Sequence, residues 1–337
     1  MKKVVLCLLL VFVFSSVRGE DYQWKRYPSL SPDGRSIAFS YQDDIYIVSS
    51  QGGKARQLTA HSAYDFRPVW SPDGKTIAFA SFRYGHFDIF IVPAEGGVPQ
   101  RVTNAPGSEI PYTFTPDGKG ILFSASIQDD PQNRLFPAYF LDELYRVDVK
   151  TQEITQILTT PAEEVFLSRT GDFFLYQDLK GGENAWRKHH TSSVARNIRL
   201  YDCNAQTHRI LTSFKGEDRN PVLNASEQTV YYLTEQFGDF NIASFPLNDP
   251  KKVKQITFHE THPVRFLSIS RNDILCYGYH GEIYLYRDGE SRKIDIKIIN
   301  EPKNYNIDRK VHTGGVSELA ASLTALRSPL WSEGMCT

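Results

Sequence analysis

One short stretch, VWSPDGKTIAF at residues 69–79, occurs three times in related form and restricts the fold more than any other feature of the chain. The other two copies are LSPDGRSIAF at residues 30–39 and FTPDGKGILF at residues 114–123. In each copy proline sets φ for the first turn position, aspartate bonds the local backbone, and glycine accepts a positive φ. The pattern is typical of a tight hairpin turn, so we expect a chain built from repeated β-hairpins.

Each full copy contains four short strands, which are clearest in the second copy as FRPVWSP, TIAFAS, FDIFIVP and VPQRVT. Its second strand is apolar at four successive positions, 77–80, where a half-exposed strand would alternate. Both faces of that strand must therefore be covered. Ser31, Ser71 and Thr115 begin the three turns, and a repeat of about 40 residues is the period of four-stranded propeller blades.

Three further copies lack the turn motif but keep the order of strands. They contain DFFLY with IRLYD, TVYYL with FNIASF, and DILCYGYH with EIYLY. We therefore predict an all-β chain whose residues 22–300 form a six-bladed β-propeller of four-stranded antiparallel blades, similar to WD-repeat propellers. A β-sandwich with accidental turn similarity is the alternative, and the recurring order of parts argues against it.

The first 19 residues, MKKVVLCLLLVFVFSSVRG, have the features of a secretory signal peptide. Two lysines precede an apolar run that is too short to anchor the chain stably in a bilayer. Cys7 lies inside that run rather than after it, which argues against a lipoprotein. We expect cleavage after Gly19, a periplasmic location and no membrane anchor after cleavage.

Charge and cysteine content exclude several functions. The chain has 38 basic and 39 acidic residues, so no net positive field attracts nucleic acid. Cys203, Cys276 and Cys336 remain after signal cleavage, and their spacing fits neither a zinc site nor a disulfide framework. We expect free thiols, no metal and no cofactor. GxSxG, HExxH and P-loop motifs are absent from the sequence, so no familiar hydrolase or nucleotide site is predicted.

The connector between the second and third strands of the fourth copy is long, KGGENAWRKHHTSSVARNIRLYD at residues 180–202. The blade pattern resembles the TolB-like propeller repeat. Together with the ENAWRKHHTSS segment, it resembles the N-terminal propeller of tricorn-type proteases over about residues 21–322. This resemblance implies a longer relative with a second propeller, a PDZ-like module and a C-terminal serine-peptidase core. It predicts that this chain is a non-catalytic propeller that gates or presents peptides to a catalytic core, that the chain lacks this core, and that it has no peptidase activity alone.

The C-terminal residues depart from the family pattern. We expect a linker and the start of a further blade over residues 301–322, and an abnormal tail over residues 323–337. With one base restored after Ser322 and suitable synonymous codons, the tail would read PDGTEVAVVVRGDVY, which supplies the missing turn. We favour a frameshift as the explanation, and the alternative is a natural stop after an unstructured tail.

Five adjacent residues of the long connector are the best candidates for ligand contacts: Trp186, Arg187, Lys188, His189 and His190. In an extended segment the two histidines point to opposite faces, which argues against a shared metal ion. The arginine and lysine could hold a peptide carboxylate. The alternative is that the tryptophan packs the loop onto its blade and that the charges are solvated.

Other loops are weaker candidates. The aromatic residues Phe82, Tyr84 and Phe237 are expected to anchor connectors. An insertion at residues 127–143 could cap the channel. Two histidines, His259 and His262, are expected to be structural or exposed. The expected partners are peptides, periplasmic proteins or further copies of the chain. A stand-alone TolB-like binding module is the main alternative function, and a small-molecule hydrolase or lyase in the channel is a third.

Overall fold

A computed structural model describes residues 24–105, 107–127, 141–182, 184, 186–189 and 191–299, together with two later backbone strands, Val316–Leu319 and Leu330–Ser332. The predicted signal peptide, most of the insertion at residues 127–143, His190 and most of the tail therefore lie outside the described residues. The chain divides into two units, residues 1–299 and 300–337.

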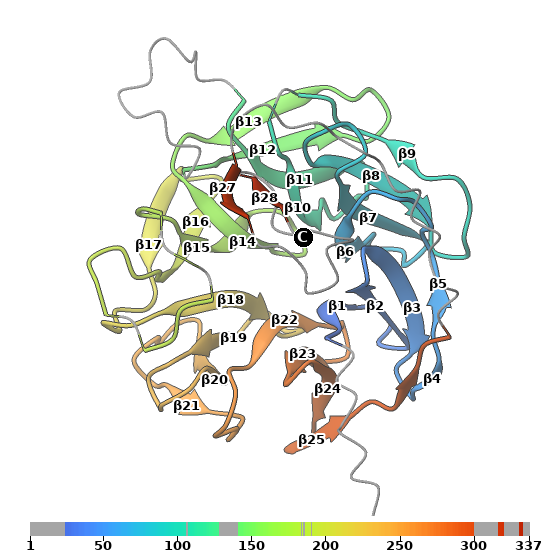
Figure 1. Cartoon of the computed structure of the whole chain (residues 1–337). Helices are drawn as coiled ribbons and strands as arrows, with labels where there is room; N and C mark the ends of the chain where they lie inside the picture. The colour runs from blue at the N-terminus through green and yellow to red at the C-terminus, as the bar shows by residue number, and fades with distance from the viewer. Residues whose placement is uncertain are drawn as a thin grey trace, which may run out of the picture. The chain divides into compact units, whose positions relative to one another are not determined.

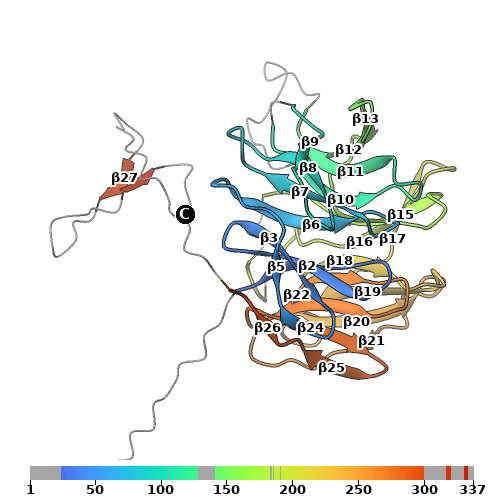
Figure 2. The same ribbon diagram turned by 90° about the vertical axis from the view of Figure 1, so that its right-hand side faces the viewer.

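The first unit contains, within its described residues, six four-stranded antiparallel sheets arranged around a common axis (Figure 1). Figure 2 shows the same sheets from the side. The predicted six-bladed propeller is confirmed.

The blades follow the order of the sequence. Blade 1 consists of β1 (Arg26–Leu30), β2 (Ser36–Tyr41), β3 (Asp44–Ser49) and β5 (Arg56–Gln57). Blade 2 consists of β6 (Asp65–Trp70), β7 (Thr76–Ser81), β8 (Asp88–Pro93) and β9 (Gln100–Arg101). Blade 3 consists of β10 (Ile110–Phe114), β11 (Gly120–Ala125), β12 (Glu143–Asp148) and β13 (Ile154–Leu158).

The second half repeats the arrangement. Blade 4 consists of β14 (Ala162–Leu167), β15 (Phe173–Asp178), β16 (Ile198–Asp202) and β17 (Thr207–Ile210). Blade 5 consists of β18 (Asp218–Leu223), β19 (Thr229–Thr234), β20 (Asn241–Pro246) and β21 (Lys254–Gln255). Blade 6 consists of β22 (Arg265–Ile269), β23 (Leu275–Tyr279), β24 (Glu282–Arg287) and β25 (Glu290–Lys293).

The hydrophobic core lies between the blades rather than at one centre. In β7 every residue after Thr76 is buried, and all six residues of β11 are buried. One apolar cluster of the described residues fills each contact between neighbouring blades, such as Phe39 with Ile283 between blades 1 and 6. Neighbouring blades therefore cover both faces of each second strand, as its continuous apolar pattern predicts.

The repeated turns have the expected chemistry. In blade 2, Ser71 donates its hydroxyl proton to the Asp73 carboxylate at 2.6 Å, and the same carboxylate accepts a hydrogen bond from the Lys75 N–H at 3.0 Å. Gly74 has φ of 71°, which favours glycine. The turns of blades 1 and 3 repeat these contacts.

A short parallel strand pair closes the ring. After blade 6 the chain forms β26 (Ile296–Lys297), which pairs with β4 (Gly53–Lys54) beside blade 1 (Figure 1). At the other end of blade 1, the buried Lys25 ammonium contacts the Glu282 carboxylate of blade 6 at 2.7 Å. The two ends of the propeller are thus joined by main-chain bonds and by a buried ion pair.

The second unit has two described strands, β27 (Val316–Leu319) and β28 (Leu330–Ser332), which pair antiparallel. The expected start of a further blade and the frameshift both stay predictions. The described residues contain no helix that is long and apolar enough to cross a bilayer.

Candidate functional site

The first strands of the blades, β1, β6, β10, β14, β18 and β22, surround the central channel (Figure 1). Each pairs with only the second strand of its own sheet, so its other edge faces the channel. The register of each pair shifts near the start of the first strand, which marks a β-bulge. At five bulges a residue other than glycine has positive φ: Tyr27, Arg67, Glu164, Asn220 and Phe266.

Side chains at these bulges form a layer across the channel. The Arg67 guanidinium of blade 2 forms an ion pair with the Glu164 carboxylate of blade 4. The same guanidinium lies over the ring of Tyr112, 4.7 Å from its centroid, and over that of Tyr27 at 5.7 Å. Tyr27 in turn contacts Phe266 of blade 6 at a centroid distance of 4.3 Å. We call these five residues the channel layer.

The channel layer holds one ion pair among neutral rings. Burial by itself lowers the pKa of Arg67, but the Glu164 carboxylate together with the Tyr112 and Tyr27 hydroxyls outweighs that effect, so the pKa is raised. Burial raises the pKa of the Tyr27 and Tyr112 hydroxyls, so both rings stay neutral. A partly buried ion pair of this kind holds its two strands together, because separating the charges would leave each without compensation.

A cavity of about 420 Å³ opens on the side of the repeated turns. Tyr112, Glu164 and Asn220 line it, so it reaches the channel layer. Its rim includes two exposed arginines, Arg169 and Arg271. This volume lies within the range of pockets that bind small molecules or a few residues of peptide.

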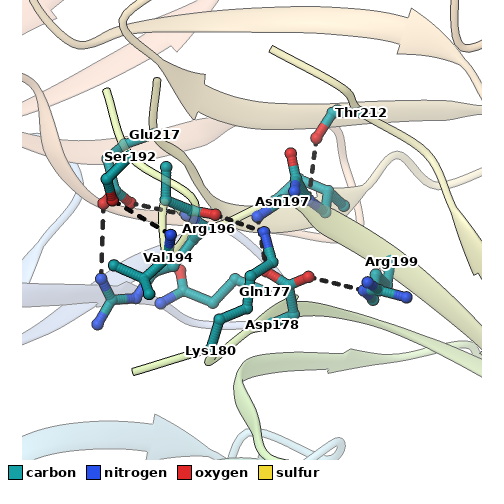
Figure 3. Close-up of polar contacts among 12 residues, drawn as sticks. Gln177, Asp178, Lys180, Ser192, Val194, Arg196, Asn197, Arg199, Thr212 and Glu217 are labelled. Carbon is teal, nitrogen blue, oxygen red and sulfur yellow. Dashed lines mark hydrogen bonds and ion pairs between the residues drawn. The ribbon is translucent and has the colours of Figure 1, made fainter. Parts of the chain in front are cut away.

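The long connector of blade 4 joins β15 to β16. It lies at the end of the propeller opposite the repeated turns. Its base is closed by polar contacts around Asp178 (Figure 3). The Asp178 carboxylate accepts hydrogen bonds from the Asn197 N–H at 2.8 Å and from Arg199 Nε at 2.7 Å. Lys180 Nζ donates to the Ala195 carbonyl oxygen at 2.5 Å. These bonds hold the two ends of the connector together.

Arg196 connects this base to the channel wall. Its Nε lies 3.2 Å from Glu163 Oε2, and its Nη1 lies 3.7 Å from Glu217 Oε1. Arg219 Nε contacts the same Glu217 carboxylate at 3.0 Å. Because Arg196 and Glu217 are buried, removing either partner would leave the other charge buried without compensation.

Trp186, the first predicted contact residue, lies at the mouth of the channel. Its side chain is 50% exposed. The ring contacts Phe266 at a centroid distance of 5.9 Å, and the guanidinium groups of Arg26 and Arg265 lie 5.3 and 5.7 Å from its centroid. Arg26 and Arg265 are the first residues of β1 and β22. The connector therefore reaches from blade 4 to blades 1 and 6.

Lys188 and His189, two further candidates for ligand contacts, contact blade 5. Asp239 Oδ1 lies 3.5 Å from Lys188 Nζ and 3.1 Å from His189 Nε2. The His189 N–H donates to the Glu235 carboxylate at 2.7 Å, and the Arg187 N–H donates to the Asn184 carbonyl oxygen at 3.1 Å. Lys188 and His189 thus fasten the connector to the loop between β19 and β20. A role for any of these residues in ligand binding stays a prediction.

Several residues of the mouth and the channel layer do not stand out in the sequence, namely Arg26, Tyr27, Arg67, Glu164, Arg265 and Phe266. The only local signal is a polar or aromatic residue before proline in the first strand, as in RYP, FRP and RNP. Proline cannot donate to a sheet and is common at bulges. Among the described residues, no cluster of three or more His, Cys, Asp or Glu residues could hold a metal ion.

The weaker loop candidates are held by neighbouring rings. The Phe82 ring contacts Phe87 at a centroid distance of 5.1 Å, and the Arg101 guanidinium lies 4.2 Å from the centroid of the Tyr84 ring. His259 Nε2 lies 3.0 Å from the Tyr277 hydroxyl, and the His262 ring contacts His280 at 3.9 Å. Each of the two histidines therefore contacts another side chain of the propeller.

Comparisons with known proteins agree with this architecture. Residues 22–292 match the family described as the tricorn protease N-terminal beta propeller domain. The crystal structure of the tricorn protease superimposes with a TM-score of 0.69 at 18% identity, over 83% of this chain and 27% of that chain. The putative TolB from Agrobacterium tumefaciens gives a TM-score of 0.58 at 16% identity, over 81% and 91% of the two chains. At these identities the solved structures show the fold alone.

Curated relatives match over shorter segments. An uncharacterized peptidase, YuxL, from Bacillus subtilis is 36% identical over 78 residues, which are 20% of this chain and 12% of that protein. A TolB homolog from Chlorobium luteolum is 35% identical over 65 residues, or 17% and 15% of the two chains. This chain therefore matches only a small part of each curated relative.

Proposed function

Because the chain belongs to the family of tricorn protease N-terminal β-propeller domains, we propose that it is the non-catalytic propeller of a periplasmic tricorn-like serine peptidase. In this proposal the propeller admits or presents peptides to a peptidase core outside the described residues. The periplasmic location follows from the predicted signal peptide.

The arrangement of the channel is the observation that carries the peptide-handling role. Six first strands direct one edge toward the channel, and the cavity on the turn side lies among them. A free strand edge can pair with the main chain of an extended peptide, whatever its side chains. A peptidase that acts on many sequences needs contacts of this kind.

The channel layer supports a gating role. It separates the cavity on the turn side from the mouth that carries Trp186. A peptide that passes along the axis must displace the Arg67–Glu164 ion pair. Because the pair bridges two blades that are not neighbours, its opening would change the width of the channel without unfolding a blade.

Peptide binding by the full chain tests the proposal. We expect labelled unstructured peptides to bind and to stay intact, as measured by fluorescence anisotropy and mass spectrometry. Arg271→Trp, which adds bulk at the cavity rim, should weaken binding. Lys252→Trp places the same bulk on an exposed residue of blade 5 away from the cavity and should leave binding unchanged. Failure to bind any peptide, or hydrolysis by the chain itself, would contradict the proposal.

A stand-alone TolB-like binding module is a second candidate. The structural match spans 91% of the putative TolB chain, so a propeller of this class can make up most of a protein. A module of this kind would bind a folded periplasmic protein in preference to unstructured peptides. Competition between the two types of ligand for the immobilised chain distinguishes the two functions.

A further inference from the structure

Exposed aromatic side chains gather at one end of the propeller. In the described residues they are Trp24, Phe82, Tyr84, Trp186, Phe237 and Phe258. All six lie before β1, in connectors between second and third strands, or in the link between two blades. Because the strands of each blade alternate in direction, these segments all lie at the end opposite the repeated turns. We call this end the connector face.

Two of the exposed rings are joined through a continuous series of ring contacts. Phe82 contacts Phe87 at 5.1 Å, Phe87 contacts Phe66 at 4.8 Å, and Phe66 contacts Tyr27 at 5.4 Å. Tyr27 contacts Phe266 at 4.3 Å, and Phe266 contacts Trp186 at 5.9 Å. The series passes the first strands of blades 2, 1 and 6. Its middle members are the buried Phe66 and the half-buried Tyr27, Phe87 and Phe266. They hold the exposed ends in place, which reduces the entropy lost when a ligand binds.

Trp186 differs from the other exposed rings in its charged neighbour. The exposed Arg26 side chain lies over the Trp186 ring and has no hydrogen bond or ion pair with any described residue. In contrast, Arg101, which lies over the exposed Tyr84 ring, is paired with the Asp88 carboxylate at 2.7 Å. The mouth of the channel therefore combines an exposed aromatic surface with the Arg26 guanidinium, which forms no ion pair with a carboxylate of the described residues.

We propose that Trp186, Phe266 and Arg26 form a binding site for extended peptide segments in which an aromatic side chain lies next to an acidic one. The aromatic side chain packs on the Trp186 ring beside Phe266, and the carboxylate pairs with the Arg26 guanidinium, which can bind it through two parallel hydrogen bonds. The site rests on the proposed function and names the kind of peptide that the mouth selects.

The placement of the rings favours a flexible chain over a folded partner. The exposed aromatics belong to segments of different blades on the connector face and so do not lie on the surface of a single sheet. An extended peptide can reach successive rings by adjusting its backbone. The same peptide lies beside the channel layer, where the free strand edges begin.

Four capped peptides of equal length test the site on the full chain, with Phe-Asp, Phe-Lys, Ser-Asp or Ser-Lys at the centre of an otherwise identical sequence. Capping removes the terminal charges, so only the central pair differs. We expect the Phe-Asp peptide to bind most tightly, by about tenfold over Ser-Asp from ring packing and about fivefold over Phe-Lys from charge.

Variants assign each preference to one side chain. Trp186→Ala should remove the preference for Phe over Ser, and Arg26→Gln should remove only the preference for Asp over Lys. Phe258→Ala is the matched control, because this ring is 73% exposed on the same face and lies outside the series of contacts. Equal affinity for the four peptides, or equal losses in Trp186→Ala and Phe258→Ala, would overturn the site alone. Absence of binding to all four would overturn the proposed function as well.

Discussion

Gly52 is the residue on which closure of the propeller depends most sharply. It lies in the turn between β3 and β4 with φ of 92°, and a Cβ atom there would be 2.6 Å from the Asp295 carbonyl oxygen. That oxygen accepts the hydrogen bond of Gly53 N–H at 2.8 Å, and Lys297 O accepts that of Ala55 N–H at 2.9 Å. The Gly52→Ala substitution should therefore displace β26 from blade 1.

Gly96 provides a matched control. It has the corresponding place in blade 2 with φ of 109°, and the nearest atom to its added Cβ is the end of the Arg56 side chain at 3.6 Å. Both substitutions carry the backbone strain of positive φ, about 1–2 kcal/mol. Only Gly52→Ala also loses two hydrogen bonds, about 1 kcal/mol each, and part of the burial of Ile296, about 1–3 kcal/mol. The difference should be about 3–5 kcal/mol.

Equilibrium unfolding in urea measures this difference. We expect the urea midpoint of Gly52→Ala to fall well below that of Gly96→Ala. The slope of the free energy of unfolding against urea concentration should be similar for the two variants if unfolding remains two-state. Hydrogen exchange should show faster exchange of the Gly53 and Ala55 amides in the Gly52 variant. Equal midpoints for the two variants would refute the argument, because strain alone would then account for both.

Three further predictions concern buried ionisable groups. Burial raises the pKa of Glu109 to about 8. Relative to Glu109→Gln, the free energy of unfolding of the wild type should therefore fall between about pH 4.5 and 8, by at most about 1.4 kcal/mol per pH unit. Parallel pH profiles of the two proteins in urea unfolding would contradict this. Arg67→Ala leaves Glu164 without its partner and should lower the free energy of unfolding by about 2–4 kcal/mol, whereas Arg67→Met combined with Glu164→Leu should recover most of the loss. Burial raises the pKa of the Cys276 thiol, which should react with a thiol reagent only after unfolding; rapid modification of the native chain would count against the core position.

Local sequence patterns predicted the blades because the residues that form each turn and each buried strand are close together in the sequence. Ser71, Asp73 and Gly74 form the turn by themselves, and the apolar run at residues 77–80 indicates a strand covered on both faces. The degraded copies are correctly predicted for the same reason, since the burial of β15, β19 and β23 depends on their own residues.

The sequence drew attention to only some of the residues that meet at the candidate site, and their role in ligand binding stays a prediction. Trp186 stands out in the sequence because its connector is long, and the structure places it at the channel mouth. Lys188 and His189 stand out equally, yet they contact Asp239 of blade 5. No local pattern distinguishes these two outcomes, because the partner of each side chain belongs to another blade.

The sequence alone determined the repeating unit, the number of blades and the order of their strands. Only the tertiary structure decided which side chains meet at the axis: Arg67 with Glu164, and Trp186 with Arg26 and Arg265. It also decided that the ring closes through β26 and β4. The physical reason is that a turn or a buried strand depends on neighbouring residues, whereas contacts at the axis depend on how six sheets pack around it.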